Sequence, residues 1–244
     1  VKHVKKLVPP WRLSGAVDFR RALAAGRAQQ LDDVPIKPGD LAFLQYTGGT
    51  TGVAKGAMLS HGNMVANVLQ VGAWMSPNLN DGEETLILPL PLYHVFALTG
   101  ALSFFAKGAQ AVLIPNPRDL PAFLKVLRQT RFTAIIGVNT LFRALLDAPG
   151  FAAVDLRPLK LAVAGGMAVQ HVVAHRWKER AGVPLVEGYG LTESAPVAIA
   201  NPVTIQEWSG QIGVPLPSTE AAILDDDGGF IARGEVGEIC LRGP

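Results

Sequence analysis

The sequence holds very little cysteine and very little net charge. Cys240 is the only cysteine among 244 residues, so no disulfide can form within it, and a disulfide-stabilised secreted fold is excluded. The 22 Lys and Arg residues nearly balance the 20 Asp and Glu residues, which leaves a net charge of +2. This balance gives no electrostatic basis for binding nucleic acid. With 49% hydrophobic and only 17% charged residues, the chain is too apolar to be disordered.

The sequence as given also lacks the patterns of a signal peptide and of a membrane span. Its lysine-rich start is followed by prolines rather than by an apolar core and a cleavage site. Residues 85–106 carry no formal charge, but Pro89 and Pro91 interrupt the run, and the part that remains is too short to cross a bilayer. We therefore expect a buried strand, a turn and a buried helix in this stretch.

From about residue 38 the sequence alternates between short apolar runs, typical of strands, and stripes with helical spacing. This alternation predicts an α/β fold with a mostly parallel sheet flanked by helices. Strands are expected at residues 41–46, 85–90, 110–114, 132–136, 159–164 and 184–187, and helices at 60–75, 96–107, 120–127, 138–146 and 168–181.

The two ends of the sequence differ from this central part. Residues 1–40 show no strong period and are expected to form a weakly structured connecting segment, so the α/β unit covers residues 41–208. In residues 209–244, short alternating runs flank a turn-rich stretch and predict a small antiparallel β unit. Val1 in place of Met, and an end two residues after Arg242, predict that the sequence is a piece of a larger protein.

The strongest candidate for a binding site is a glycine- and threonine-rich loop after the first predicted strand. Its glycines allow successive backbone N–H groups to surround an anion, its threonines add hydroxyl donors, and Lys55 adds a positive charge. This combination suits a polyphosphate, although Ala54 stands where a Walker A loop has glycine. A flexible linker is the alternative, but linkers lack the strand and helix that flank this loop. The candidate ligand-binding residues are Thr47, Gly48, Gly49, Thr50, Thr51, Gly52, Lys55 and Gly56.

Three more candidates follow predicted strands, and ligands of open α/β sheets bind at the carboxyl ends of strands. Residues 187–193 offer a tyrosine ring on which a purine can stack and a carboxylate suited to Mg²⁺; a solvated polar turn is the alternative. Gly165 and Gly166 let a ring or a phosphate lie against the backbone, unless they form an ordinary strand-to-helix turn. His94 can polarise a substrate carboxylate, or it is a core histidine with its hydrogen bonds satisfied.

Taken together and in order, these motifs resemble the adenylate-forming superfamily, which includes acyl-CoA synthetases, the adenylation domains of peptide synthetases, and luciferases. The closest resemblance is to bacterial long-chain fatty acyl-CoA synthetases, and it extends over nearly the whole chain. The segments that carry it are residues 44–61 (LQYTGGTTGVAKGAMLSH), 89–98 (PLPLYHVFAL), 137–142 (GVNTLF), 188–196 (GYGLTESAP) and 237–239 (GEI).

The resemblance implies a two-step reaction with ATP, Mg²⁺ and CoA. A fatty acid carboxylate attacks the α-phosphorus of ATP to give acyl-AMP and pyrophosphate, and the CoA thiol then displaces AMP. Because carboxylate and ATP repel each other, the first step needs charge neutralisation and alignment. The implied catalytic residues are Lys55, His94, Thr192 and Glu193, of which Glu193 binds the metal.

The resemblance also distributes the binding roles. The loop at residues 47–56 holds the β- and γ-phosphates, Thr192 contacts the α-phosphate, and Tyr189 stacks on adenine. The nucleotide site further includes Gly165, Gly166, Glu187, Gly188 and Gly190, and the acyl site is formed by His94, Gly137, Val138 and Asn139.

Other parts of the family pattern follow the point where the sequence ends. They are an Asp that grips the ribose hydroxyls, an Arg near it, and a hinged small domain with a catalytic Lys. We therefore expect a complete parent enzyme to be a ligase and the 244-residue chain alone to be inactive.

Several alternatives stay open at this stage. They are a CoA ligase for another carboxylate such as a medium-chain or aryl acid, a nucleotide-binding module without catalysis, and a membrane-interaction piece built on Lys2, Lys5 and Lys6. The expected partners are fatty acid, ATP and CoA, without nucleic acid. The expected location is cytoplasmic, with a weak peripheral attachment to the inner face of the membrane and a homodimer left open.

Overall fold

The structure is a computed structural model, and it describes residues 13–47 and 55–244. The chain divides into two units, residues 1–36 and 37–244. In the first unit, helix α1 (Phe19–Gly26) begins after Asp18, whose side chain accepts a hydrogen bond from the backbone N–H of Arg21. The periodicity of the sequence did not indicate this helix, because it has only 8 residues and buries none of them.

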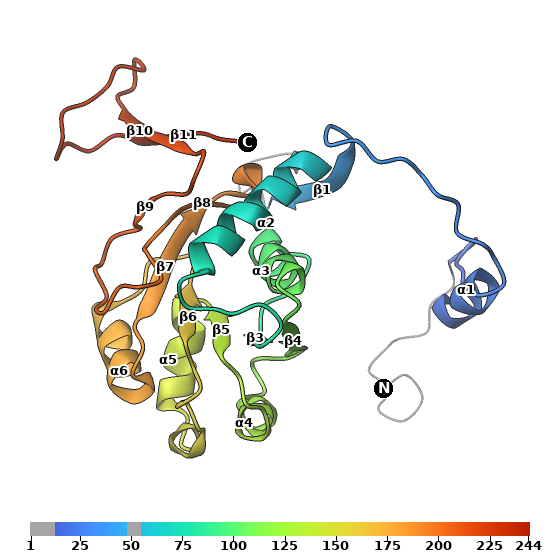
Figure 1. Ribbon diagram of the computed structural model, residues 1–244, viewed down its shortest axis with the longest axis horizontal. Helices are drawn as coiled ribbons and strands as arrows, with labels where there is room; N and C mark the ends of the chain where they lie inside the picture. Colours follow the sequence, from blue (N-terminus) through green and yellow to red (C-terminus); the bar gives the residue numbers. More distant parts are fainter. Residues whose placement is uncertain (1–12, 48–54) are drawn as a thin grey trace. The chain divides into compact units, whose positions relative to one another are not determined.

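The second unit contains the predicted α/β layers, with a seven-stranded sheet in the order β4-β3-β5-β6-β7-β8-β9 (Figure 1). The first five strands in this order pair in parallel, and β8 and β9 add antiparallel pairs at one edge. The prediction of a mostly parallel sheet is confirmed. The strands are β3 (Thr85–Leu88), β4 (Gln110–Leu113), β5 (Ala134–Gly137), β6 (Leu161–Ala164), β7 (Leu185–Gly190), β8 (Val197–Ala200) and β9 (Val214–Pro215).

Helices cover both faces of this sheet, and each face has its own hydrophobic core. Helices α4, α5 and α6 pack on the face that carries Ile87 and Ile135, whereas α2 and α3 pack on the face that carries Leu86 and Ile136. Successive strand residues point to opposite faces, which explains this alternation. The helices are α2 (His61–Met75), α3 (Val95–Ala106), α4 (Leu120–Gln129), α5 (Asn139–Asp147) and α6 (His171–Ala181), with 3-10 turns η1 (Phe151–Ala153) and η2 (Thr192–Ser194).

Aromatic packing anchors the α4–α6 face. Trp177 of α6 is fully buried, with the ring of Phe142 edge-on at 4.7 Å and the ring of Phe151 stacked at 5.9 Å between centroids. Such aromatic pairs contribute roughly 0.5–1.5 kcal/mol beyond the area they bury. The core on this side therefore fixes α6 firmly against the sheet.

A buried ion pair lies at the amino-terminal ends of the strands. Glu84 is 2% exposed, and its Oε1 accepts hydrogen bonds from Lys160 Nζ at 2.7 Å and from the backbone N–H of Asn80 at 2.8 Å. Burial raises the pKa of Glu84, but hydrogen bonds from Lys160, Thr133 and Asn80, together with the charge of Lys160, outweigh burial and leave the pKa below its ordinary value.

Some predicted elements need correction. The strand expected at residues 41–46 forms as β1 (Leu41–Thr47), but it lies outside the parallel sheet and pairs antiparallel with β2 (Lys55–Ser60). Lys55 and Gly56, expected in a loop, are the first residues of β2. The residues after Glu187, expected in a turn, continue β7 to Gly190 because β8 pairs with them.

Other predictions are confirmed. The uncharged run over residues 85–106 contains strand β3, a turn and helix α3, as expected. At the carboxyl-terminal end, β10 (Glu220–Leu224) pairs antiparallel with β11 (Glu238–Arg242). No helix in the described part of the chain is both long enough and apolar enough to cross a membrane. The domain boundaries expected at residues 40 and 208 remain predictions.

Candidate functional site

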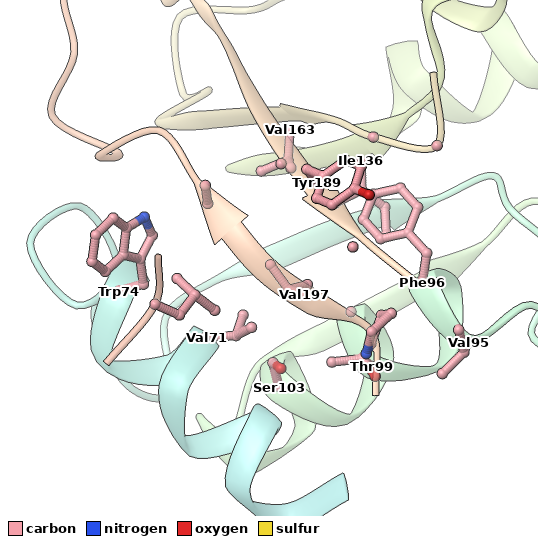
Figure 2. Close-up of a pocket in the computed structure, with 18 of the residues that line it drawn as sticks. Val71, Trp74, Val95, Phe96, Thr99, Ser103, Ile136, Val163, Tyr189 and Val197 are labelled. Atoms are coloured by element: carbon pink, nitrogen blue, oxygen red, sulfur yellow. The ribbon is translucent and has the colours of Figure 1, made fainter. Parts of the chain in front are cut away.

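A cavity of about 460 Å³ lies between the sheet and helices α2 and α3, and residues at the carboxyl ends of β6 and β7 line it (Figure 2). Parallel sheets bind their ligands at these strand ends. The structure brings most of the described candidate residues together around this one cavity. They are Thr47, His94, Gly165, Gly166, Glu187, Gly188, Tyr189, Gly190, Thr192 and Glu193.

The cavity runs along helix α3. Near its first turn, Val95 packs with Ala195, next to η2 and its polar side chains. Near its last turn, Phe104 packs in one cluster with Met75 of α2. The cavity is therefore polar near the start of α3 and apolar towards its end, where α2 contributes Val71 and Trp74 to the lining (Figure 2).

The glycine pair after β6 is required by its surroundings. Gly166 has a φ of +76°, in the left-handed region that favours glycine. A Cβ on Gly165 would lie 3.1 Å from the ring of Phe96, so the absence of a side chain allows this ring to pack against the backbone. Figure 2 shows Phe96 and Tyr189 on the same side of the cavity, where a flat ligand would meet both the backbone and an aromatic face.

The carboxylate of Glu187 forms its hydrogen bonds with other residues of the protein. One carboxylate oxygen accepts a hydrogen bond from the backbone N–H of Val169 at 2.9 Å, and the other accepts one from Trp208 Nε1 at 2.6 Å. The residue is 7% exposed. It therefore joins β7 to the segment after Gly166 and to the Trp208 loop, and it holds in place the strand end that was predicted to bind a nucleotide.

A tight corner presents the next part of the motif. The N–H of Leu191 donates to Pro196 O at 3.1 Å, and Ser194 Oγ accepts a hydrogen bond from the N–H of Leu191 at 2.9 Å. A Cβ on Gly190 would lie 1.8 Å from Pro196 O, so only glycine fits this approach. The 3-10 turn η2 then places Thr192 and Glu193 at the cavity.

Glu193 is exposed beside the polar end of the cavity, which suits a carboxylate that ligates a cation shared with a phosphate. In residues 13–47 and 55–244, no group of three or more His, Cys, Asp or Glu side chains could hold a metal ion by itself. A Mg²⁺ at Glu193 would thus take its remaining oxygen ligands from phosphates and water, as this ion usually does.

His94 is held in one orientation at the start of α3. Its Nδ1 accepts a hydrogen bond from the backbone N–H of Phe96 at 3.3 Å, so in the neutral ring the proton is on Nε2. The neighbouring Tyr93 O accepts a hydrogen bond from Gln45 Nε2 of β1 at 2.8 Å, which fixes the turn to the hairpin. The ring can therefore donate from Nε2 to an anion at the polar end of the cavity.

The loop predicted to bind phosphate is only partly described. Its two ends are paired across the hairpin, where Thr47 Oγ1 donates to Lys55 O at 3.3 Å. Thr47 lines the cavity, whereas Lys55 and Gly56 do not. Gly48, Gly49, Thr50, Thr51 and Gly52 lie outside the described residues.

Of the residues expected to form the acyl site, His94 lines the cavity, whereas Gly137, Val138 and Asn139 do not. Ile136 lines it, but the next residue, Gly137, faces the opposite layer, where a Cβ would meet Leu141 and Phe142 of α5. Asn139 uses its Oδ1 to accept a hydrogen bond from the N–H of Gln170. Val138 lies one layer behind the cavity, with Cγ1 3.7 Å from the Cβ position of Gly166.

Sequence reasoning missed a large part of the cavity lining, which comes from α2, from α3 and from sheet positions facing them. A signal was present, because α3 is apolar on every side instead of along one stripe, as is typical of a helix that contacts more than one apolar surface. The residues that were missed include Val71, Trp74, Met75, Thr99, Gly100, Ser103, Phe104, Ile136, Val163 and Val203.

Comparison with known proteins gives matches along almost the whole chain. A family model described as AMP-binding enzyme matches residues 4–244. The long-chain-fatty-acid–CoA ligase of Escherichia coli O157:H7 is 53% identical over 245 aligned residues, which cover 100% of this chain and 44% of the relative. The feruloyl-CoA synthase of an Amycolatopsis species is 35% identical, with coverage of 91% and 47%. The chain thus spans less than half the length of these curated relatives.

Solved structures show the same fold. The crystal structure of ATP-bound MatB from Rhodopseudomonas palustris superposes with a TM-score of 0.75 and 28% sequence identity. The match covers 91% of this chain and 43% of that one.

Proposed function

The chain belongs to the AMP-binding enzyme family, and from this premise we propose that it is the nucleotide- and acyl-binding part of a long-chain fatty acyl-CoA ligase. In the proposed reaction, the carboxylate of a fatty acid attacks the α-phosphorus of ATP, which gives acyl-AMP and releases pyrophosphate. The thiol of CoA then attacks the acyl carbonyl carbon, and AMP leaves as acyl-CoA forms.

The observation that carries this proposal is the composition of the cavity. One space contains the glycine, tyrosine and threonine motifs at its polar end and continues between α2 and α3 into an apolar end. An acyl-adenylate has the same two-part character. Each CH₂ group buried at the apolar end would contribute about 0.8 kcal/mol, which favours long chains.

The proposed roles at the polar end follow from charge. Two anions, a carboxylate and ATP, must approach each other, so donors and cations at their meeting point lower the barrier most. Lys55 and the loop that it closes would hold the outer phosphates, and Thr192 would donate to the α-phosphate. Glu193 would hold Mg²⁺, which supplies charge neutralisation on the phosphates, and His94 Nε2 would donate to the acyl carboxylate.

Tyr189 and the glycine pair Gly165–Gly166 are proposed to hold adenine. The tyrosine offers an aromatic face, and the glycines leave the opposing backbone open. ATP as the nucleotide is supported by the ATP-bound state of MatB, which has the same fold.

An aryl or other acid is the second candidate substrate, because feruloyl-CoA synthase is also a relative. The higher identity to long-chain ligases, 53% against 35%, and the apolar end between α2 and α3 both favour a fatty acid.

A substrate panel tests the assignment. Pyrophosphate release by the full-length protein would be measured with octanoate, palmitate and ferulate, and then repeated with CoA to detect the thioester. The proposal expects the highest kcat/KM for palmitate. A higher kcat/KM for ferulate would overturn the fatty acid assignment.

The same assay separates a ligase from a nucleotide-binding module without catalysis. Lys55→Ala in the full-length protein is expected to lower turnover by about 10²-fold or more, the usual cost of losing one charge-stabilising donor. Lys125→Ala, on the exposed side of α4, is the matched control and should leave turnover unchanged. Binding of ATP by a wild-type protein that shows no turnover with any acid would favour the module.

The proposal also covers the activity of the 244-residue chain alone, its location and its oligomeric state. The 244-residue chain is expected to form no acyl-CoA by itself, since the resemblance assigns a ribose-binding Asp and a catalytic Lys to later residues. A cytoplasmic location with weak attachment to the membrane surface would show as partial co-sedimentation with anionic liposomes, and a homodimer would show in sedimentation equilibrium.

A further inference from the structure

Helix α3 carries a glycine in its interior, where glycine costs about 1 kcal/mol relative to alanine. A Cβ on this residue, Gly100, would lie 2.8 Å from Cδ1 of Ile136 on β5. Both residues line the cavity. The absence of a side chain at position 100 therefore leaves room for the tip of Ile136 against the helix backbone.

The position of Gly100 along the cavity follows from helical geometry. The residues of α3 that line the cavity beyond its first residue are Phe96, Thr99, Gly100, Ser103 and Phe104, with the i, i+3, i+4, i+7 and i+8 spacing of one helical face. A rise of about 1.5 Å per residue places Gly100 roughly 6 Å beyond Phe96 and Phe104 roughly 12 Å beyond it. Gly100 thus lies between the polar end and the apolar end.

We propose that Gly100 and Ile136 form the constriction that sets how long an acyl chain the cavity admits. This inference rests on the proposed function and goes further, because it names the pair that determines chain length. An acyl chain that passes the constriction reaches Phe104, Val71 and Trp74. An acyl chain that ends before it contacts only the part of the cavity beside the first turn of α3.

The contact geometry explains why the pair acts together. The contact atom of Ile136 is the flexible end of its side chain, so a small group at position 100 can be accommodated by rotation of Cδ1. Rotation of Cδ1 does not make enough room for a branched side chain at position 100, so such a side chain would fill the cavity between its polar and apolar ends. Short acids that end before this depth would be unaffected.

The test compares two acids in variants of the full-length protein. In Gly100→Val, the ratio of kcat/KM for palmitate to kcat/KM for hexanoate is expected to fall at least about tenfold, the lower range for a misfit of one or more methylenes in an apolar pocket. The kcat/KM for hexanoate should stay within about twofold, because a six-carbon chain that starts at His94 would end before the constriction, six residues or about 9 Å further along α3.

Two further variants sharpen the test. Ile136→Ala removes as many carbon atoms as Gly100→Val adds, so the double variant is expected to regain most of the palmitate activity. Gly72→Val on α2 is the matched control, because its Cβ would meet no atom within 4 Å and the residue does not line the cavity. This control should keep the wild-type ratio.

The outcomes separate this inference from the proposed function. A wild-type protein that activates fatty acids, with an unchanged ratio in folded Gly100→Val, overturns the constriction and leaves the proposed function standing. A wild-type protein that activates no fatty acid overturns both. If circular dichroism shows that Gly100→Val does not fold, Gly100→Ala, which favours the helix, carries the same test, because its methyl group displaces Cδ1 of Ile136 and should narrow the cavity enough for a smaller fall in the ratio.

Discussion

Replacing Glu187 with glutamine probes how the nucleotide motif is held, because the change preserves the shape of the side chain and alters only its hydrogen bonding. Both carboxylate oxygens now accept hydrogen bonds, from Val169 N–H and from Trp208 Nε1. Glutamine offers one acceptor oxygen and one NH₂ group, so one of the two donors, the buried Val169 N–H or the partly buried Trp208 Nε1, would face another donor. A buried donor without an acceptor costs about 1–3 kcal/mol.

We therefore expect Glu187→Gln to lower the free energy of unfolding by about 1–3 kcal/mol. Glu187→Ala leaves both donors unpaired and should cost about twice as much, roughly 2–6 kcal/mol. Urea denaturation followed by tryptophan fluorescence measures both values.

The same variants should weaken binding of a palmitoyl-adenylate mimic, because Glu187 ties the segment after Gly166 to β7 beside Tyr189. Glu179→Gln is the control, since Glu179 lies on the exposed face of α6 with 65% of its side chain exposed. It should change stability by less than about 0.5 kcal/mol. Equal stability and equal binding of Glu187→Gln and Glu179→Gln would refute the positioning role.

Three further changes test the fold and the corner of the site. Trp177→Ala removes a fully buried ring and should lower the free energy of unfolding by about 3–5 kcal/mol in urea denaturation. The lowered pKa of Glu84 means that its ionised form stabilises the folded state above about pH 4.5, and that this contribution is lost as the pH falls through the lowered pKa. The stability difference between wild type and Glu84→Gln should therefore shrink between about pH 6 and about pH 3, and a constant difference would contradict the ion pair with Lys160. Gly190→Ala would force a Cβ to within 1.8 Å of Pro196 O, so a loss of about 1–3 kcal/mol and weaker binding of the adenylate mimic are expected in calorimetry.

Local signals made much of the fold predictable. Ser60 and Asp119 each cap a helix with their own side chain, and these two helices begin where the sequence analysis placed them. Strand β2 and the extension of β7 were missed because each depends on a partner strand, β1 or β8, and pairing with a partner can override the turn preference of glycine.

The candidate site also has parts that local sequence signals predict and parts that depend on packing between distant segments. Its polar motifs were identifiable because glycine, tyrosine and carboxylate chemistry is carried by short segments at strand ends. The acyl wall was assigned to residues 137–139, but the strand alternation directs Ile136 to the cavity and Gly137 to α5. The apolar end arises where α2, α3 and the sheet pack together, and no single segment encodes that arrangement.

The most direct test of the central claim, that one cavity holds both the nucleotide and the acyl chain, is calorimetric titration of the chain with a non-hydrolysable palmitoyl-adenylate mimic. ATP and palmitate would be titrated separately for comparison. The account predicts that the mimic binds more tightly than either half and that Tyr189→Ala weakens its binding. Binding of the mimic no tighter than ATP alone, by a chain shown to be folded, would contradict a shared cavity.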